Sequence, residues 1–251
     1  MELKNNERID DLEFENLKII QNTDGFCFGI DSVLLSDFAK NIKRNSKVVD
    51  IGTGTGIISI LLSKKANVDK IYGVEIQDEV ADMAKRSVKL NNLEGKIEII
   101  NDDIKNIGKY LENNTIDVIV SNPPYKKVCT GIKNENEKLL ISRHEIKCNL
   151  ENIAEISRKL LKDKGEIYIV HKSERLVDII TTFRQNNLEV KQLRLVQATV
   201  DSKPNLVLVK AVKNGGEFLT IDKPLIIYKD KNIYSDEILQ IYNKNRKEEN
   251  K

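Results

Sequence analysis

The sequence predicts an α/β protein with one mostly parallel sheet of seven strands. Short apolar runs rich in β-branched residues alternate with segments whose apolar residues recur at helical spacing. A strand at residues 47–51 passes through a glycine-rich turn into an apolar helix that begins at residue 57. No helical segment separates the last two runs, at 190–196 and 206–212, so these should form a hairpin. Connections before that hairpin should be right-handed crossovers.

Length and composition bound the domain organisation. A chain of 251 residues fits a single α/β domain with additions. Hydrophobic residues make up 40% and charged residues 32%, which is enough apolar material for a sizeable core and unlike a disordered chain. We divide the chain into an N-terminal extension at 1–30, a core domain at 31–214 and a tail at 215–251. The tail should hold a strand and a helix capped at Ser235.

Several functional classes are disfavoured. The apolar runs are too short to cross a membrane, and the charged start Met1–Lys4 lacks the core of a signal peptide, so we expect a cytoplasmic protein. The cysteines are odd in number and widely spaced, and the chain has two histidines, so neither a disulfide framework nor a metal site is expected. These residues are Cys27, Cys129, Cys148, His144 and His171. The net charge of only +2 means that contact with nucleic acid would depend on local patches.

Local patterns predict the elements around the core strands. Residues 14–20 alternate roughly, as in a strand or hairpin arm, and a helix should follow with Asp31 or Ser32 as its cap. The helix that begins near residue 150 should stop at Gly165, a C-cap glycine. The remaining core strands are expected at 70–75, 96–101, 116–120 and 166–170.

The glycine-rich turn after the first core strand predicts a ligand site. Gly52, Gly54 and Gly56 lack side chains that would keep a ligand away from the backbone. Their spacing is neither that of the dinucleotide fingerprint nor that of a Walker loop. Glu75 ends the second strand, where a carboxylate can accept hydrogen bonds from both hydroxyls of an adenosine ribose. A nicotinamide cofactor would need the same contact, so Glu75 indicates a ribose without identifying the cofactor.

A stiff arm, Asn122-Pro123-Pro124-Tyr125, follows the strand at 116–120. The two prolines fix φ and remove two backbone donors, and the residue before a proline is restricted to extended conformations. The arm therefore holds an amide, carbonyl oxygens and an aromatic ring at the carboxyl end of a strand, where ligands bind in open α/β sheets. A proline-rich surface turn is the alternative, but the position downstream of the glycine turn favours a functional role.

This arm suits the methylation of an sp² amino nitrogen, whose delocalised lone pair makes it a poor nucleophile. The side-chain oxygen of Asn122 and the carbonyl of Pro123 are placed to accept both amino hydrogens, which draws electron density onto the nitrogen. Tyr125 is placed to stack on the flat base, a contact worth roughly 1–3 kcal/mol. Catalysis would then rest on positioning and fixed dipoles.

The Asn-Pro-Pro-Tyr signature resembles that of amino-group methyltransferases that use S-adenosylmethionine (SAM). The likeness implies their Rossmann-like seven-stranded class I sheet with a C-terminal β-hairpin. Asp50, directly before the glycine turn, resembles motif I, in which the acid lies near the methionine end of the cofactor. The likeness also implies an acid at Asp102 or Asp103 that accepts from the cofactor adenine. We favour Asp103 and expect Asp102 to cap the short helix that follows.

Further segments resemble bacterial valine-tRNA adenine N6-methyltransferases, which modify the adenine 3′ of the anticodon. These segments are residues 25–35, Arg143-His144-Glu145 and 224–228. The resemblance implies SAM as cofactor and tRNA as partner, and we expect a monomer. The polar segment 126–147 carries an excess of three positive charges and is placed to contact phosphates. For any single lysine of the segment, simple exposure to solvent is an equally good explanation. We interpret His144 as a structural hydrogen-bonding group, with a role as general base as the alternative.

Several other functions are compatible with the same residues. A side-chain amide presents the same nitrogen, so glutamine methylation in a release factor is the nearest alternative, although no N-terminal helical domain for a protein partner is apparent. Methylation of ribosomal RNA or DNA is another. A nicotinamide-dependent oxidoreductase and a catalytically silent nucleotide-binding module are alternatives from other classes; the glycine spacing and the arm disfavour the oxidoreductase.

Overall fold

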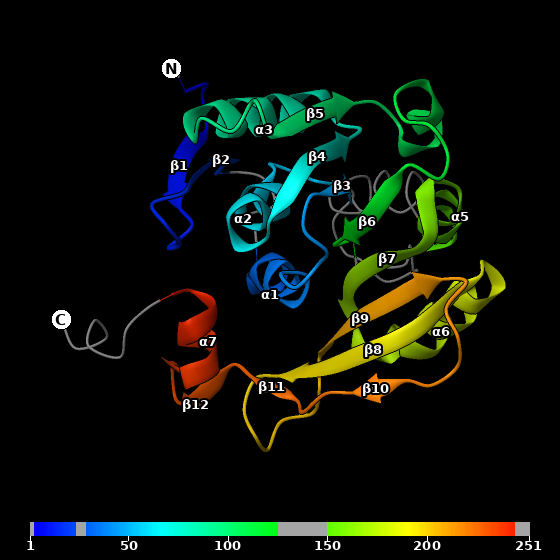
Figure 1. Cartoon of the computed structure of the whole chain (residues 1–251). Coiled ribbons are helices and arrows are strands. Elements are labelled where there is room, and N and C mark those ends of the chain that lie inside the picture. The colour runs from blue at the N-terminus through cyan, green and yellow to red at the C-terminus, as the bar shows by residue number, and fades with distance from the viewer. Residues whose placement is uncertain (1–2, 24–28, 125–149, 244–251) are drawn as a thin grey trace, which may run out of the picture.

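The computed structural model describes residues 3–23, 29–124 and 150–243 (Figure 1). Tyr125, His144, the three cysteines and the polar segment 126–147 lie outside these ranges, so the predictions made for them are not assessed by the structure. No helix within the described ranges is long and apolar enough to cross a membrane.

The core is one sheet with the predicted seven strands. These are β3 (Ser46–Ile51), β4 (Val68–Glu75), β5 (Ile97–Asn101), β6 (Ile116–Ser121), β7 (Leu161–Lys172), β8 (Leu188–Gln197) and β9 (Leu206–Lys213). They lie in the order β8-β9-β7-β6-β3-β4-β5, and β9 runs antiparallel to both of its neighbours (Figure 1). The fold class and the terminal hairpin of the sheet are confirmed. Two short strands, β10 (Thr220–Ile221) and β11 (Leu225–Ile226), extend the sheet along β8.

Helices cover both faces of the sheet, because the strands are apolar on both sides. Consecutive residues such as Val48 and Val49 are fully buried and belong to opposite apolar clusters. One cluster packs against α1 (Ile30–Phe38) and α2 (Ile57–Lys65), and the other against α5 (Leu150–Leu160) and α6 (Leu176–Gln185). The helix α3 (Asp78–Leu90) and the 3₁₀ turns η1 (Ile104–Lys109) and η2 (Ser173–Arg175) complete the connections.

The N-terminal arm is a hairpin, as predicted. Strand β1 (Glu7–Asp11) pairs antiparallel with β2 (Lys18–Asn22), and β2 lies along α3 (Figure 1). In the tail, a small hairpin of β12 (Tyr228–Asp230) and β13 (Ile233–Tyr234) precedes α7 (Asp236–Ile241). The hydroxyl of Ser235 accepts from the Ile238 amide at 3.3 Å, which confirms the predicted cap.

Gly165 does not end a helix, contrary to the prediction. Helix α5 ends at Leu160, and the chain enters β7 at the next residue, so Gly165 lies inside the strand. A Cβ at Gly165 would come within 3.0 Å of the Lys162 carbonyl oxygen and 3.1 Å of the Leu161 side chain. The glycine is therefore needed for a close approach where the strand begins irregularly, next to Lys164 at a φ of 60°.

Candidate active site

The strand register brings the predicted site residues to one edge of the sheet. Ile51 pairs with Val74 on one side and with Ser121 on the other, and Glu75 pairs with Asn101. Gly52 and Asn122 each follow one of these paired residues, so the glycine turn and the proline arm leave adjacent strands at the same level. This is the carboxyl edge, where open α/β sheets bind ligands.

The glycine turn requires glycine for its backbone conformation. Gly52, Gly54 and Gly56 have φ values of 70°, 59° and 95°, in the left-handed region that disfavours a side chain. The amides of Gly52 and Thr53 both donate to the Val74 carbonyl at 3.0 Å, which holds the turn against β4. A Cβ at Gly52 or Gly54 would meet nothing within 4 Å, so the space beside these residues is open to a ligand.

Asp50 lies buried beneath this turn, and one of its two carboxylate oxygens accepts hydrogen bonds. Its Oδ2 accepts from Thr53 Oγ1 at 2.7 Å and from Ser59 Oγ at 2.8 Å, which ties the strand to the turn and to α2. Its Oδ1 is buried without a hydrogen-bond partner among the described residues. Burial raises the pKa of Asp50 to about 6, against the opposing effect of the two hydroxyl donors. A buried acceptor with spare capacity fits a site that a donor or cation completes.

Glu75 joins the turn to the chain after β4. Its Oε2 accepts from the Gly54 amide at 3.1 Å, and its Oε1 accepts from the Gln77 amide at 2.9 Å. The carboxylate is 6% exposed and is held at the open side of the glycine turn. Oε1 also accepts from Gln77 Nε2 at 3.3 Å, whereas Oε2 has a second lone pair, so the arrangement is compatible with acceptance from a ribose hydroxyl.

The two neighbouring acids after β5 have different local roles. Asp103 is the N-cap of η1, and its side chain accepts from the Lys105 amide at 3.0 Å. The carboxylate of Asp102 accepts from the Asp103 amide, the Asn106 side chain and the Tyr110 hydroxyl at 2.7–3.0 Å. The prediction that Asp102 caps η1 is therefore wrong, because the cap lies one residue later. Which acid meets a cofactor adenine stays a prediction.

Asn122 is held from two directions. The preceding Ser121 donates from its hydroxyl to the Ile51 carbonyl at 2.9 Å, and Asn122 Nδ2 donates to Ser32 Oγ at 3.0 Å. Asn122 is half-buried, Pro123 is buried and Pro124 is exposed.

The contact with Ser32 was not foreseen, and the predicted cap of α1 was wrong. Gly29 is the N-cap, in an extended conformation, and no side chain caps the helix. Asp31 and Ser32 lie inside the first turn, where Ser32 is 5% exposed and turned to the proline arm. Nothing in the sequence around Ser32 indicates a hydrogen bond with Asn122, which lies 90 residues further along the chain.

His171 is buried in β7 and stays neutral. Its Nδ1 accepts from the Lys172 amide at 2.8 Å, and burial lowers its pKa to about 4. Within the described ranges, no group of three histidine, cysteine or acidic residues is arranged to hold a metal ion.

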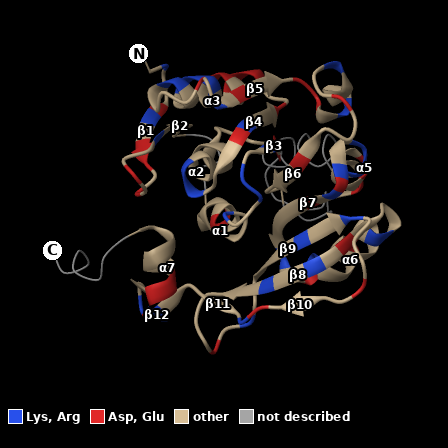
Figure 2. Ribbon diagram, viewed as in Figure 1, with Lys and Arg blue, Asp and Glu red and all other residues tan. Residues whose placement is uncertain are grey.

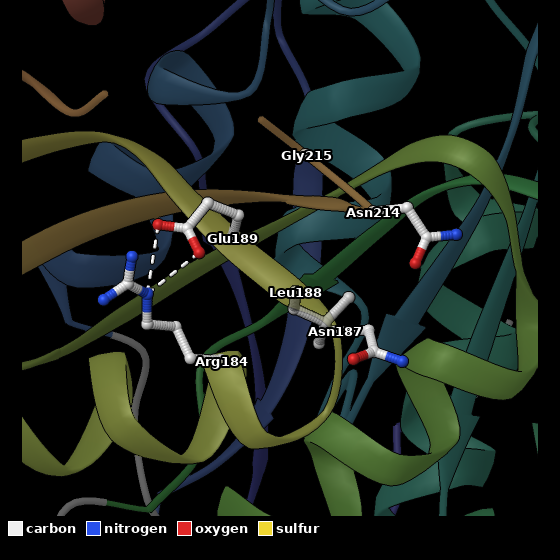
Figure 3. A pocket seen from close by; sticks show the side chains of 6 residues that line it. All are labelled: Arg184, Asn187, Leu188, Glu189, Asn214 and Gly215. Carbon is white, nitrogen blue, oxygen red and sulfur yellow. Dashed lines mark hydrogen bonds and ion pairs between the residues drawn. The ribbon is translucent and has the colours of Figure 1, made fainter. Parts of the chain in front are cut away.

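A separate hollow of about 200 Å³ lies at the opposite edge of the sheet, where β8 begins and β9 ends (Figure 3). Its lining is largely polar, and Arg184 points to Glu189 with its Nε 2.9 Å from Oε2 (Figure 3). The hollow shares no residue with the glycine turn or the proline arm.

Comparison with known proteins gives a consistent result. The family described as methyltransferase small domain matches residues 28–194, more than half of the chain. A tRNA1(Val) (adenine(37)-N6)-methyltransferase of Phocaeicola vulgatus is 25% identical over 91% of this chain and 94% of its own length. A protein of the same name from Parabacteroides distasonis is 26% identical over 79% of this chain and 81% of its own.

Solved structures share the fold. A predicted O-methyltransferase from Agrobacterium tumefaciens superposes with a TM-score of 0.69 at 17% identity, covering 85% of this chain and 95% of that one. The M. jannaschii protein TYW2, in complex with AdoMet, gives a TM-score of 0.55 at 16% identity, covering 84% and 87%.

Proposed function

The chain belongs to the methyltransferase small domain family, and from this membership we propose that it transfers a methyl group from SAM to the exocyclic N6 of an adenine in tRNA. The anticodon loop of valine tRNA is the proposed location, by likeness to relatives that span most of the chain and are named for that reaction. The observation that carries the proposal is the placement of Asn122 beside the glycine turn, on adjacent strands in register. Relatives named for tRNA modification disfavour release-factor methylation.

The cofactor would be held by residues of the first two strands. SAM supplies an electrophilic methyl group on a positively charged sulfonium. The open backbone at Gly52 and Gly54 admits the ligand, Glu75 accepts from the ribose, and Asp103 is proposed to meet the adenine. Asp50, with its unpartnered buried oxygen, adds negative charge below the turn on the side proposed for the methionine end. A cation bound there lowers the cost of ionising this buried carboxyl.

The acceptor base would be held by the proline arm. The Asn122 side-chain oxygen and the Pro123 carbonyl are proposed to accept the two N6 hydrogens. This polarises the amino group and directs its lone pair away from both acceptors, toward the glycine turn. Fixed acceptors of this kind need no reorganisation during the reaction. Tyr125, outside the described ranges, is proposed to stack on the base.

An anticodon-loop base fits a compact enzyme. Such a base is already single-stranded, so splaying it into a pocket costs less than flipping it from a duplex. Basic and acidic residues are interspersed over the described elements (Figure 2), so we expect the segment 126–147 to supply part of the RNA contact. The proposal includes a cytoplasmic location, where tRNA is modified, and action as a monomer.

The first test identifies the acceptor. The purified protein is incubated with SAM carrying a labelled methyl group and with separate pools of tRNA, ribosomal RNA, DNA and protein. Label should enter tRNA, and nuclease digestion with mass spectrometry should map it to N6-methyladenosine in the anticodon loop. Label confined to the protein pool, or to another nucleotide, would refute the proposed acceptor.

The second test addresses Asn122. Asn122→Ala should reduce methyl transfer by about 100-fold or more, the scale of losing a transition-state hydrogen-bonding group. The Kd for SAM, measured by calorimetry, should stay within about 2-fold, because Asn122 holds the base and not the cofactor. A variant with wild-type turnover would remove Asn122 from the mechanism.

A further inference from the structure

We propose that Ser32, in the first turn of α1, is a positioning residue that sets the orientation of the Asn122 amide. The inference rests on the proposed function, because it assigns Ser32 a role through Asn122. It adds a second segment of the chain, far from the proline arm in sequence, to the determinants of the reaction.

The contact between the two side chains is direct and partly buried. Asn122 Nδ2 donates to Ser32 Oγ at 3.0 Å, and the two residues are 90 positions apart. Helix α1 packs on β7, the neighbour of β6 from whose end the arm emerges, and it also packs on α2, which follows the glycine turn. Ser32 is therefore fixed relative to both halves of the candidate site. Ser32 as a residue is 5% exposed, so little water reaches it to compete for the amide.

The orientation matters because the two ends of an amide have opposite hydrogen-bonding roles. If the Asn122 side chain turned by about 180° about its last torsion, its NH₂ group would replace the oxygen that is proposed to accept from the adenine N6. Two donors would then face each other. Pro123 restricts the backbone of Asn122, so the side-chain torsions are the freedom that remains to be fixed. While the Ser32 hydroxyl accepts from Nδ2, as observed, Oδ1 lies on the other side of the amide.

Ser36 offers a matched control in the same helix. It is fully buried, one turn after Ser32, and its hydroxyl donates to the Val33 carbonyl at 2.7 Å. Ser36→Ala removes a buried hydroxyl from α1 without touching the arm. Ser32→Ala places a good helix former in the first turn, and Ser32→Cys is nearly isosteric but a weak acceptor. Ser32→Thr restores the hydroxyl.

The kinetic test separates positioning from cofactor binding. With an unmodified valine tRNA transcript, Ser32→Ala and Ser32→Cys should lower kcat by about 10-fold or more, since a misplaced group costs on that scale. The Kd for SAM should stay within about 2-fold, Ser32→Thr should recover most of the rate, and Ser36→Ala should behave as wild type. Wild-type turnover in Ser32→Ala, an equal loss in Ser36→Ala, or a loss confined to SAM affinity would overturn the proposal.

A binding test reads the amide orientation without turnover. Anticodon stem-loops carrying either adenine or purine, which lacks the 6-amino group, are titrated onto the protein bound to S-adenosylhomocysteine. The wild type should prefer adenine by about 10-fold or more, because purine lacks both of the proposed N6 hydrogen bonds. The preference should fall by about 3-fold or more in Ser32→Ala, which misplaces one of the two acceptors, and persist in Ser36→Ala. A preference that Ser32→Ala leaves intact would refute the role of Ser32.

Failure of the two proposals is distinguishable. If the wild type methylates no tRNA, the proposed acceptor is wrong, and the Ser32 variants are compared on the pool that does accept methyl groups. If Asn122→Ala is inactive while Ser32→Ala matches the wild type in both tests, the proposed function stands and only the role of Ser32 is wrong.

Discussion

The hydroxyl of Ser121 donates a hydrogen bond to the main-chain carbonyl of Ile51, 2.9 Å away, and so joins the carboxyl ends of two neighbouring strands. Both residues are fully buried. The next residue along each strand, Asn122 or Gly52, belongs to one half of the candidate site. The bond therefore sets the spacing between the proposed substrate arm and the proposed cofactor turn.

Ser121→Ala should destabilise the protein and slow methyl transfer. Removal of the hydroxyl leaves a buried carbonyl without this partner, at a cost of about 1–3 kcal/mol. Urea denaturation measures the loss. Ser157→Ala is the contrast, since the Ser157 hydroxyl is buried with no partner among the described residues and its removal should be neutral or stabilising. Equal destabilisation by both variants would mean that the bond to Ile51 contributes nothing.

The buried carboxyl of Asp50 should give stability a distinctive pH dependence. Burial raises its pKa to about 6 from an ordinary value of 3.8, so the folded state favours the protonated form. A raised pKa contributes stability that is complete below the unfolded pKa and is lost as pH rises through the folded one. In the protein without cofactor, stability attributable to Asp50 should therefore decline between about pH 4 and pH 6.

Asp50→Asn isolates this effect. The stability of the variant relative to wild type should rise by up to about 3 kcal/mol between pH 4 and pH 7.5, while its affinity for SAM falls. Asp117→Asn is the control of opposite sign, because the hydrogen bond from Lys162 lowers the pKa of Asp117 despite its partial burial. Its relative stability should fall as pH rises. Parallel pH profiles for the two variants would contradict the assignment.

The buried side chain of Lys65 contacts both the N-terminal hairpin and α7. Its Nζ donates to the Ile241 carbonyl at 2.6 Å, lies 3.4 Å from Asp37 and sits 4.3 Å from the centre of the Phe14 ring. The side chain is only 3% exposed, and burial lowers its pKa. Lys65→Met keeps the apolar stem but removes all three contacts, and it should cost about 3 kcal/mol in urea denaturation.

Lys40→Met tests whether burial of Lys65 is the reason for its larger contribution to stability. Lys40 pairs with the same Asp37 carboxylate at 3.0 Å, but its side chain is 45% exposed. An exposed pair of this kind contributes about 0.5 kcal/mol or less. If the two substitutions cost the same, the tie from Lys65 to α7 and to the N-terminal hairpin is not a significant source of stability.

The central fold was predictable because its signals are local. β-branched runs, the glycine turn and the missing helix before β9 each act within a short window. They predicted the strands and the terminal hairpin, whereas the class I sheet was implied by the likeness to amino-group methyltransferases. The error at Gly165 has a non-local cause. The glycine has the residue type expected of a helix C-cap, but β7 pairs with β6 and β9 and contains it, because tertiary contacts override a residue's usual preference.

The position of the candidate site was predictable from the sequence, but the contacts between its side chains were not. Glycines at positive φ and an acid at a strand end can be inferred from type and spacing, which is why Gly52, Gly54 and Glu75 lie where the strands predict. The bond between Ser32 and Asn122 depends on how α1 packs across β7, and no spacing rule in the sequence specifies that contact.

A partly buried ion pair between Glu7 and Arg86 should contribute to the attachment of the N-terminal hairpin to α3, beside the hydrogen bonds that join β2 to Ser87 and Asn91. Arg86 donates two hydrogen bonds to Glu7, with its nitrogens at 2.5 and 2.7 Å, and a third to Asp82 at 2.9 Å. The hydrogen bonds from Arg86 lower the pKa of Glu7, so this attachment persists at neutral pH and weakens only in acid. Arg86→Met should raise amide hydrogen-exchange rates in β1 and β2 by about 10-fold, a loss of roughly 1.4 kcal/mol of local stability.

Arg8→Met is the control, since it also removes one positive charge, from β1 of the hairpin itself, whereas Arg86 lies in α3. Arg8 pairs with Asp10 within β1, and its side chain is 50% exposed, so the loss of that pair should change exchange by no more than about 2-fold. The double variant Glu7→Leu with Arg86→Met should recover part of the protection, because no unpaired carboxylate then remains at the interface. Equal acceleration in Arg8→Met and Arg86→Met would show that net charge, rather than the partly buried pair with Glu7, holds the hairpin on α3.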